Sequence, residues 1–485
     1  MSRRGDSLLV TLGCALLVTG CTVGPNYVRP EPPAVRSYTP TPVTASVSAA
    51  NVAGGESQRF SDGEEIPARW WELFHSTPLN ALVERALQRN HDLKAAEAAL
   101  IVAHENVLAQ RAAYYPSVAA SFSASRSKSS ADLSPTPSSG ALLYSLYTPQ
   151  VSVSFVPDVF GLNRRQVEVL AAQQQASRFQ REAVYLALTS NVVVAAIQEA
   201  SLRAQIAAAR ALIGLNERSL AVLREQQARG YAGQLDVAAQ EAQLAQVRAG
   251  LPPLLKQLAL QRDLLDVLSG TFPNEELAAH FELSQLQLPT DLPLSLPSRL
   301  VEQRPDVRQA EENLHAASAA IGVAVANRLP TITLTADAGK SAVTLGALSE
   351  GATGFWDLGA SITQPIFAGG ALLHRERAAR AAFEQAREQY RSTVLAAFQN
   401  VADTLAALEH DAEALQASAA SASAAKSALD MVQAQQRAGY ANYLQLLSAE
   451  QTYQNASIIE AQAQANRYAD TAALLQALGG GWWNR

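Results

Sequence analysis

The segment Gly369–Leu478 contains one turn, Ala438-Gly439-Tyr440-Ala441-Asn442, and no proline. Before the turn, apolar residues recur at seven-residue spacing, at Val394, Val401, Leu408 and Leu415. This spacing predicts a helix that packs lengthwise on its neighbours. About 70 helical residues, at about 1.5 Å rise each, would form a rod roughly 100 Å long. We therefore predict one very long helix, a tight turn, and a second helix that returns beside it.

An earlier segment has the same pattern. After Phe160-Gly161 the chain becomes helical for nearly 70 residues, turns at Gly230-Tyr231-Ala232-Gly233, and returns as a helix to about Gly250. Its heptad residues are Leu202, Ala209, Asn216 and Leu223. Leu251-Pro252-Pro253 predicts a kink or an interruption of the returning helix, because two prolines remove two hydrogen-bond donors.

Alternating sequences predict two β-hairpins, over residues 116–158 and 330–366. In the first, Val118, Ala120 and Phe122 alternate with serines, and in the second Ile332 and Leu334 alternate with threonines. Strands with one apolar and one small polar face suit either a half-exposed sheet in water or the wall of a membrane barrel. The strands by themselves favour the sheet in water.

The two halves of the chain resemble each other. Asn90-His91-Asp92-Leu93 matches Arg304-Pro305-Asp306-Val307 at a shift of 214, and the two turns match at a shift of 209. We therefore predict a first repeat at 67–270 with its tip near 230, a connector at 271–297, a second repeat at 298–478 with its tip near 439, and a tail at 479–485. Four strands cannot close a barrel, since about eight are needed, but three copies would supply twelve.

The N-terminus predicts export and anchoring. Residues 1–20 combine two arginines with the short apolar run Leu8–Val18, which indicates a signal peptide. Its end, Leu17-Val18-Thr19-Gly20-Cys21, is similar to a bacterial lipobox, which predicts lipid attachment at Cys21. An ordinary signal peptide with an incidental cysteine is the alternative. Residues 21–66 are rich in Pro, Ser and Thr and predict an extended tether, and the cluster Trp70–Phe74 predicts packing.

Composition excludes several classes of function. A net charge of −6, spread along the chain, offers no basic face for nucleic acid. The two cysteines, Cys14 and Cys21, lie at the N-terminus, and the seven histidines have no ligand spacing, so we expect no metal and no cofactor. The sequence has no nucleophile elbow, phosphate loop or dinucleotide fingerprint. We therefore expect no enzyme, and no catalytic residues.

The sequence resembles the TolC superfamily of outer-membrane factors, specifically the NodT-type efflux lipoproteins. The resemblance rests on Cys21–Tyr27, on Trp70–Phe74 and on the junctions Phe160-Gly161 and Phe367-Ala368-Gly369. It implies a mixed α/β membrane protein, mostly long helices in coiled-coil hairpins, with an internal two-fold repeat. Its four strands per chain would complete a trimeric twelve-stranded β-barrel in the bacterial outer membrane, anchored by lipid and continued by a helical tunnel across the periplasm.

The same resemblance implies a passive conduit for small molecules such as drugs and toxic compounds. The partners would be two further copies of the chain, a periplasmic adaptor, an inner-membrane pump of the resistance-nodulation-division class, and outer-membrane lipid. The helical tips would contact the adaptor through Arg229, Gly230, Tyr231, Arg437, Gly439 and Tyr440. Alternatively, these residues serve only the shape of the turn.

The chain departs from the family pattern just after the second tip. Two acidic residues often ring the aperture in the family, but these positions are Gln445 and Ser448 here. Tyr440 and Tyr443 remain candidates for narrowing the pore. Two rival functions are a lipid-anchored periplasmic coiled-coil scaffold or adhesin without a pore, and an envelope hydrolase, for which the sequence offers no nucleophile.

Overall fold

The structure is a computed structural model and describes residues 22–41, 46–47, 52, 54–128, 143–275 and 279–485. The chain forms two compact units. Unit 1 contains residues up to 30, 100–176 and 310–390, and unit 2 contains residues 31–99, 177–309 and 391–485. Each unit thus combines segments from both halves of the sequence. The predicted boundaries at 67–270 and 298–478 describe similarity along the chain instead, and they stay a prediction.

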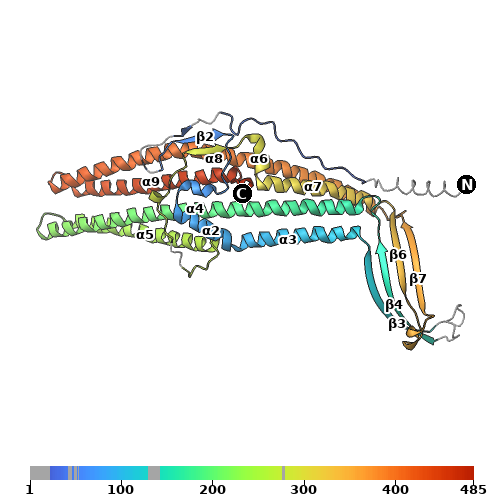
Figure 1. The fold of residues 1–485 in the computed structure, drawn as a ribbon. Helices are drawn as coiled ribbons and strands as arrows, with labels where there is room; N and C mark the ends of the chain where they lie inside the picture. Colours follow the sequence, from blue (N-terminus) through green and yellow to red (C-terminus); the bar gives the residue numbers. More distant parts are fainter. Residues whose placement is uncertain (1–21, 42–45, 48–51, 53, 129–142, 276–278) are drawn as a thin grey trace. The chain divides into compact units, whose positions relative to one another are not determined.

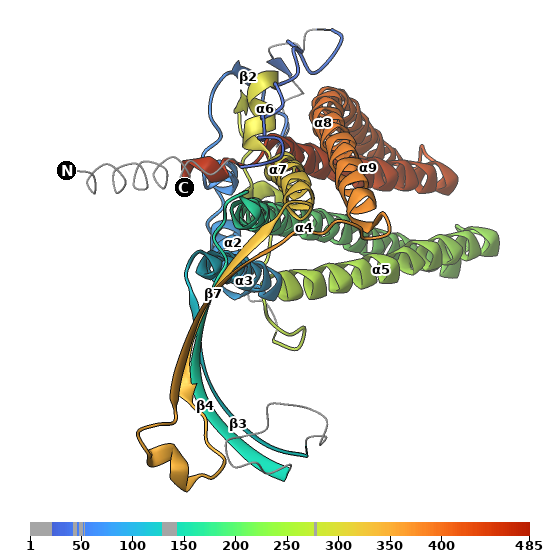
Figure 2. The same cartoon turned by 90° about the vertical axis from the view of Figure 1, so that its right-hand side faces the viewer.

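Unit 1 contains an antiparallel sheet of four strands in the order β3-β4-β6-β7 (Figure 1). The strands are β3 (Ser117–Lys128), β4 (Leu143–Phe155), β6 (Thr331–Lys340) and β7 (Gly354–Thr363). Both predicted hairpins are confirmed, and β4 pairs with β6 to join them into one sheet. Figure 2 shows the four strands as a single curved layer.

Apart from the N-terminal segment, the rest of unit 1 is mainly helical. It contains α3 (His91–Arg111) from Leu100, α4 (Leu162–Ala228) as far as Ala176, α7 (Pro305–Ala326) from Ala310, and α8 (Ala371–Arg437) as far as Tyr390. Two short 3₁₀ turns, η2 (Ala112–Tyr114) and η4 (Gly346–Ser349), flank the strands. In each half a helix leads into a hairpin of strands, and the hairpin leads into a long helix.

Unit 2 contains two antiparallel helical hairpins, the remainder of α4 with α5 (Gln234–Leu268), and the remainder of α8 with α9 (Tyr443–Ala477) (Figures 1 and 2). The predicted heptads are confirmed, because Val401, Leu408 and Leu415 are fully buried. One apolar cluster joins all four helices near the turns, through Leu220, Leu223, Val237, Leu244, Leu429 and Leu446. Burial of such apolar stripes is what stabilises helices of this length.

The sequence predicts a kink or an interruption at Pro252 and Pro253 in the first hairpin, and the structure excludes the interruption. Helix α5 is not interrupted at Pro252 and Pro253, since it continues to Leu268. The two prolines remove only two of its hydrogen bonds, and the remaining bonds and the packing of the helix outweigh that loss. Helix α4 is long and apolar enough to cross a membrane, the one such helix in the described ranges, but two-thirds of its most apolar window is buried within the protein.

Unit 2 also contains a small sheet that the sequence did not predict. Its strands are β1 (Ser46–Val47), β2 (Gln58–Asp62) and β5 (Asp291–Leu294), and β2 pairs with β5 in parallel. The short helices of this region are η1 (Trp70–Phe74), α2 (Thr77–Arg89), η3 (Leu283–Gln285), α6 (Pro297–Gln303) and η5 (Trp482–Asn484). The predicted tether therefore contributes two strands, β1 and β2, to a folded unit.

The aromatic cluster Trp70–Phe74 forms the core of this region. Trp70, Trp71 and Phe74 are at most 1% exposed, so the packing interpretation is confirmed. The Phe74 and Tyr468 rings lie 6.4 Å apart between centroids. Asn90 caps helix α3, because its Oδ1 accepts the Leu93 amide at 3.0 Å.

Candidate functional site

The four-stranded sheet has one apolar face and one polar face. The register brings Val118 opposite Val153, Val153 opposite Ala336, and Ala336 opposite Leu358, so the apolar residues of all four strands share a face. The other face carries Ser117, Ser121, Ser152, Ser154, Thr331, Thr333, Thr335, Asp337, Asp357 and Ser361. This two-residue alternation is the pattern of a sheet that separates an apolar from an aqueous medium.

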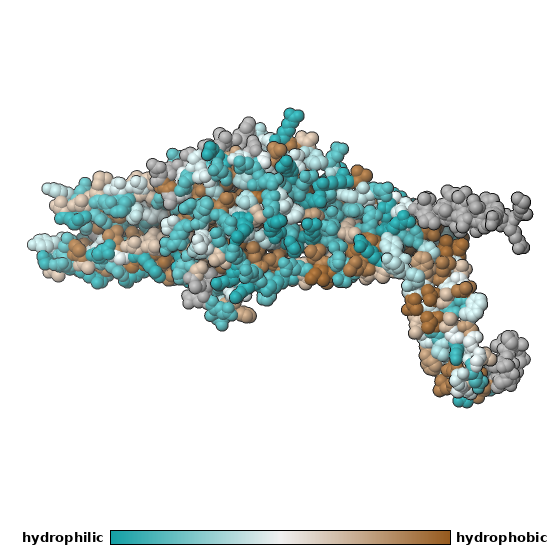
Figure 3. All heavy atoms as spheres, viewed as in Figure 1, coloured by the Kyte–Doolittle hydropathy of each residue, from teal (hydrophilic) through white to brown (hydrophobic). Residues whose placement is uncertain are grey.

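The apolar face is open to its surroundings. Trp356, Leu358 and Ile362 are 75%, 72% and 71% exposed. Figure 3 shows apolar side chains gathered over the strands of this sheet. A continuous apolar surface of this kind is rare on proteins in water and indicates a surface that faces lipid or another protein.

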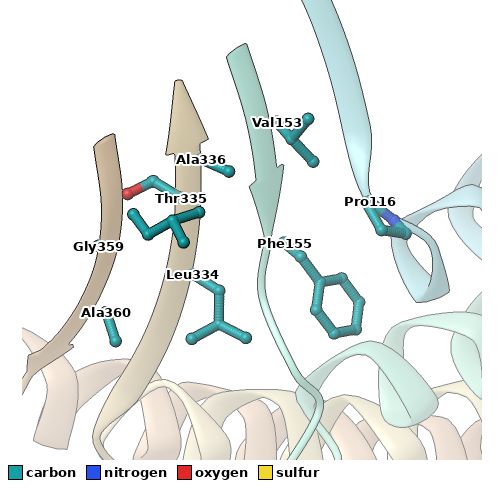
Figure 4. A pocket seen from close by; sticks show the side chains of 9 residues that line it. Pro116, Val153, Phe155, Leu334, Thr335, Ala336, Gly359 and Ala360 are labelled. Carbon is teal, nitrogen blue, oxygen red and sulfur yellow. The ribbon is translucent and has the colours of Figure 1, made fainter. Parts of the chain in front are cut away.

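A hollow of about 410 Å³ lies in the sheet near the ends of the strands. Figure 4 shows Val153, Phe155 and Leu334 projecting from neighbouring strands around it. Among the described residues that line it, Thr335 alone bears a hydroxyl group and none is charged. The hollow lacks the convergent polar groups that orient a ligand, so it belongs to the apolar wall.

Both edges of the sheet are open. Strands β3 and β7 are the outer strands, and among the described residues each pairs along one side only. An edge strand presents unpaired backbone N–H and C=O groups, which cannot remain unpaired in lipid. The sheet is therefore complete only when its edges meet further strands.

The two helical tips have the same backbone geometry. Gly230 and Gly439 adopt φ of 79° and 80°, as predicted for left-handed turn residues. The Tyr231 amide donates to the Gln226 carbonyl, and the Tyr440 amide donates to the Gln435 carbonyl, both at 2.8 Å. The tips are thus two copies of one closing motif.

The predicted tip residues differ in whether their side chains are free to contact a partner protein. Tyr231 and Tyr440 are 80% and 87% exposed, and a Cβ at Gly230 or Gly439 would meet nothing within 4 Å. Arg229 pairs with Glu225 on its own helix, and the Arg437 Nε donates to the Gln433 carbonyl at 3.2 Å. The tyrosines, rather than the arginines, are therefore the side chains free to contact a partner.

The candidate constriction residues differ in their hydrogen bonds and in their exposure. The Gln445 Oε1 accepts the Asn442 amide at 2.8 Å, and the Gln445 amide donates to the Asn442 Oδ1 at 3.0 Å, so Gln445 caps helix α9. Ser448 is exposed one turn later. The side chain of Tyr443 lies outside the described part of the structure. Tyr440 is 87% exposed.

The sequence did not predict a clasp for the N-terminal segment, built on Arg165 of helix α4. The Arg165 guanidinium is almost fully buried and donates to the Val23 carbonyl at 3.0 Å, the Gly24 carbonyl at 3.3 Å and the Asn26 Oδ1 at 2.9 Å. A Cβ at Gly322 would lie 2.8 Å from the Arg165 Cδ, so glycine makes room for this side chain.

Further contacts extend the clasp along the same segment. The Tyr27 ring stacks on His315 of helix α7 with centroids 4.3 Å apart, and the Arg29 Nε lies 3.0 Å from the Glu311 Oε1. The Val23 amide donates to the Phe160 carbonyl at 3.3 Å. Residues 23–29 are therefore extended but docked. Cys21 lies outside the described residues, two positions before this segment.

No metal site emerges from the described residues. Within those ranges, no three His, Cys, Asp or Glu side chains gather closely enough to hold an ion. His280 contacts Arg203, and His315 contacts Glu168 and Glu312.

An open sheet with an exposed apolar face, combined with long helical hairpins, is the architecture expected of a channel protein of the bacterial outer membrane. The chain belongs to the outer membrane efflux protein family, whose model matches residues 82–271 and 296–480. The probable efflux pump outer membrane protein TtgC of Pseudomonas putida is 29% identical over 486 residues, covering 100% of this chain and 97% of its own length. The pyoverdine export outer membrane protein OpmQ of the same species is 29% identical over 448 residues, covering 92% and 94%.

Solved structures agree with this assignment. The outer-membrane channel OprN superimposes with a TM-score of 0.82 at 26% identity, covering 95% of this chain and 100% of its own. The open state of the MtrE channel of Neisseria gonorrhoeae gives a TM-score of 0.80 at 27% identity, covering 95% and 99%. The predicted family, efflux function and outer-membrane location are confirmed, and nothing in these relatives favours the scaffold or adhesin. The family is one of efflux channels and not of enzymes.

Proposed function

We propose that three copies of the chain assemble into one passive conduit. Three four-stranded sheets close a twelve-stranded barrel in the outer membrane, and the helical hairpins continue it as a tunnel in the periplasm. The observation that carries the proposal is the sheet of β3, β4, β6 and β7, which has an exposed apolar face and two open edges. Closure by neighbouring copies would satisfy the edges, and lipid would cover the apolar face.

The conduit works with two further proteins, a periplasmic adaptor and an inner-membrane pump of the resistance-nodulation-division class. The pump supplies the energy, because the chain offers no nucleotide-binding motif. The exported compounds are small molecules such as drugs and toxic compounds. Relatives named for efflux and for pyoverdine export support this class of cargo.

The helical tips are the proposed contact with the adaptor. Both tips end in an exposed tyrosine, Tyr231 or Tyr440, followed by an exposed leucine, Leu235 or Leu444. Exposed aromatic and aliphatic side chains on a rigid turn are typical of protein-binding surfaces. Tyr440, Tyr443 and Ser448 are the proposed lining of the periplasmic aperture, with Gln445 holding the start of α9.

The segment that follows the proposed lipid anchor, Cys21, is held close to the first strand-to-helix junction. The clasp of Arg165 fixes Val23, Gly24 and Asn26, and the Val23 amide binds the carbonyl of Phe160. The proposed lipid on Cys21 would anchor the chain two residues before this docked segment. This arrangement requires the predicted removal of residues 1–20.

The internal duplication is also part of the proposal. Helices α4 and α8 both contain 67 residues, and α5 and α9 both contain 35. The order of helix, two strands, long helix and returning helix is the same in both halves. Duplication of an ancestral repeat explains why one chain supplies two similar helical hairpins to the tunnel wall.

Planar-bilayer recording tests the proposed conduit. Detergent-extracted protein should elute at three times the protomer mass and produce stepwise ionic conductance. A monomer that produces no conductance would contradict the proposal. The scaffold alternative makes a different prediction for Cys21→Ser, since loss of the only anchor would release the protein from the membrane, whereas an inserted barrel would retain it.

A further inference from the structure

Glu450 of helix α9 is a carboxyl group buried in an apolar environment. Glu450 is fully buried. The residues four before it and three after it on α9 lie on the same helix face: Leu446 belongs to the apolar cluster that joins α4, α5, α8 and α9, and Tyr453 packs against that cluster. The Glu450 Oε1 accepts a hydrogen bond from the Ser219 hydroxyl of α4 at 3.2 Å. Its Oε2 has no hydrogen-bond partner among the described residues. A charged carboxylate is therefore poorly solvated at this position.

The corresponding residue of the first hairpin has the opposite environment. Glu241 precedes Glu450 by the same 209 residues that separate the two tips. Its side chain is half-exposed, and its Oε1 lies 2.6 Å from the Arg224 Nη2. One hairpin thus carries a solvated, paired glutamate where the other carries a buried one. Glu241 therefore provides a matched control for Glu450 within the same chain.

The charged groups of the surrounding helices do not neutralise Glu450. On α4 and α5, Arg224 pairs with Glu241 and Glu217 pairs with Arg248, and Arg218 is exposed. On α8, the Lys426 Nζ lies 2.5 Å from the Asp430 Oδ1 and 5.8 Å from the centre of the Tyr453 ring of α9. Burial raises the pKa of Glu450 to about 7, and the Ser219 hydroxyl opposes that rise. Burial and Ser219 are thus the forces that set its protonation.

We propose that Glu450 is a proton-controlled latch between α9 and α4: the neutral carboxyl allows the second hairpin to pack on the first near the tips, and the ionised carboxylate loosens that packing. A group whose pKa is raised in the packed state binds its proton more tightly there than in a solvated state. The stabilisation is complete below the ordinary pKa of 4.5 and is lost as the pH rises toward about 7. Acid therefore closes the latch, and neutral pH loosens it.

The consequence for transport rests on the proposed function, because loosening near the tips affects passage only if the tips surround an aperture. The packing equilibrium itself does not depend on transport. It is measured on the full-length protein in detergent by hydrogen–deuterium exchange, corrected for the intrinsic effect of pH on exchange. The reporter is the peptide covering residues 443–456, and the peptide covering residues 234–248 is the internal reference.

In the wild type, protection of residues 443–456 should fall at least tenfold between pH 5 and pH 8, since each pH unit within the window changes the equilibrium about tenfold. Glu450→Gln, which mimics the neutral acid, should stay protected at both pH values. The matched control Glu241→Gln should respond like the wild type. A wild type without pH response, or the same response in Glu450→Gln, would overturn the latch.

Ser219→Ala keeps the inference testable if Glu450→Gln folds poorly. Removing the hydroxyl removes the one hydrogen bond, among the described residues, that favours the carboxylate of Glu450. The midpoint of the pH response should therefore move to higher pH. An unchanged midpoint would contradict the role of Glu450. A second buried acid, Asp411 of α8, whose pKa is raised to about 7 by burial and by Asp470, lies outside the reporter peptide and remains unchanged in every variant.

Discussion

Arg165 shows how much a single buried side chain contributes to this protein. Its guanidinium supplies three hydrogen bonds to the N-terminal segment and pairs with Glu168 at 2.7 Å. Hydrogen bonds from a charged donor contribute more than neutral ones, roughly 1.5–3 kcal/mol each. The neighbouring Arg164 contacts Asp158 and remains half-exposed. The two residues are therefore a natural comparison of buried and exposed arginine.

Arg165→Ala should release residues 23–29 from the helices. We expect the docked segment to lose about 2 kcal/mol of stabilisation, because the Val23 and Gly24 carbonyls lose their charged donor. Limited proteolysis of the purified protein should then cleave this segment much faster than in the wild type. Arg164→Ala should leave the cleavage rate nearly unchanged. Equal rates in all three proteins would show that Arg165 does not hold the segment.

A second single-residue substitution, Tyr440→Ala, tests whether the helical tips contact the adaptor. Since the side chain is 87% exposed, Tyr440→Ala removes no internal packing, and trimers should form normally. We expect a several-fold loss of efflux, measured as drug susceptibility of cells that depend on this channel, because an exposed aromatic contributes strongly to protein contacts. The control Val222→Ala changes another exposed residue, away from the tip. Full efflux by Tyr440→Ala would argue against an adaptor contact at this residue.

The helices and strands that could be predicted from the sequence are those whose apolar residues recur at regular spacing. The heptads of α4 and α8 and the alternation of β3, β4, β6 and β7 are periodic, and periodicity reports which face is buried. Strands β1, β2 and β5 have two to five residues, and β2 pairs with a strand more than 200 residues away. Pairing between short strands so far apart in the sequence produces no local sequence pattern from which it could be predicted. The Arg165 clasp was missed for the same reason.

The two faces of strand β7 provide a matched pair of substitutions. Leu358→Arg places a charge on the apolar face, and Ser361→Arg places the same charge on the polar face. A charge facing lipid near the centre of the membrane costs about 2–4 kcal/mol. Leu358→Arg should lower the amount of trimer in the outer-membrane fraction several-fold, and Ser361→Arg should leave it close to wild type. Equal yields would contradict the assignment of the apolar face to lipid.

For the whole molecule, the number of strands was the most informative prediction from the sequence. Four strands per chain are too few for a barrel, and the structure confirms an open sheet of four. The family match and the superposition on OprN then establish an outer-membrane efflux channel. The proposed aperture was the least predictable part, because Gln445 and Ser448 stand where acids were expected, and because Glu450 is buried although its repeat counterpart Glu241 is half-exposed.

Cross-linking of the two edge strands tests the trimeric barrel most directly. Ser121→Cys on β3 is combined in turn with Asp357→Cys, Gly359→Cys or Ser361→Cys on β7. Within one chain two strands separate these positions, so at about 4.8 Å per spacing they lie about 14 Å apart, beyond the reach of a disulfide. Ser121→Cys with Gln150→Cys, which are directly opposite in the sheet, is the control for a bond within one chain.

After oxidation in membranes, at least one edge-to-edge pair should give covalent dimers and trimers on a denaturing gel, and the control pair should give monomers only. A barrel closed by three copies requires this result, because β3 of one copy then lies beside β7 of the next. Monomers at every edge-to-edge position would contradict the barrel.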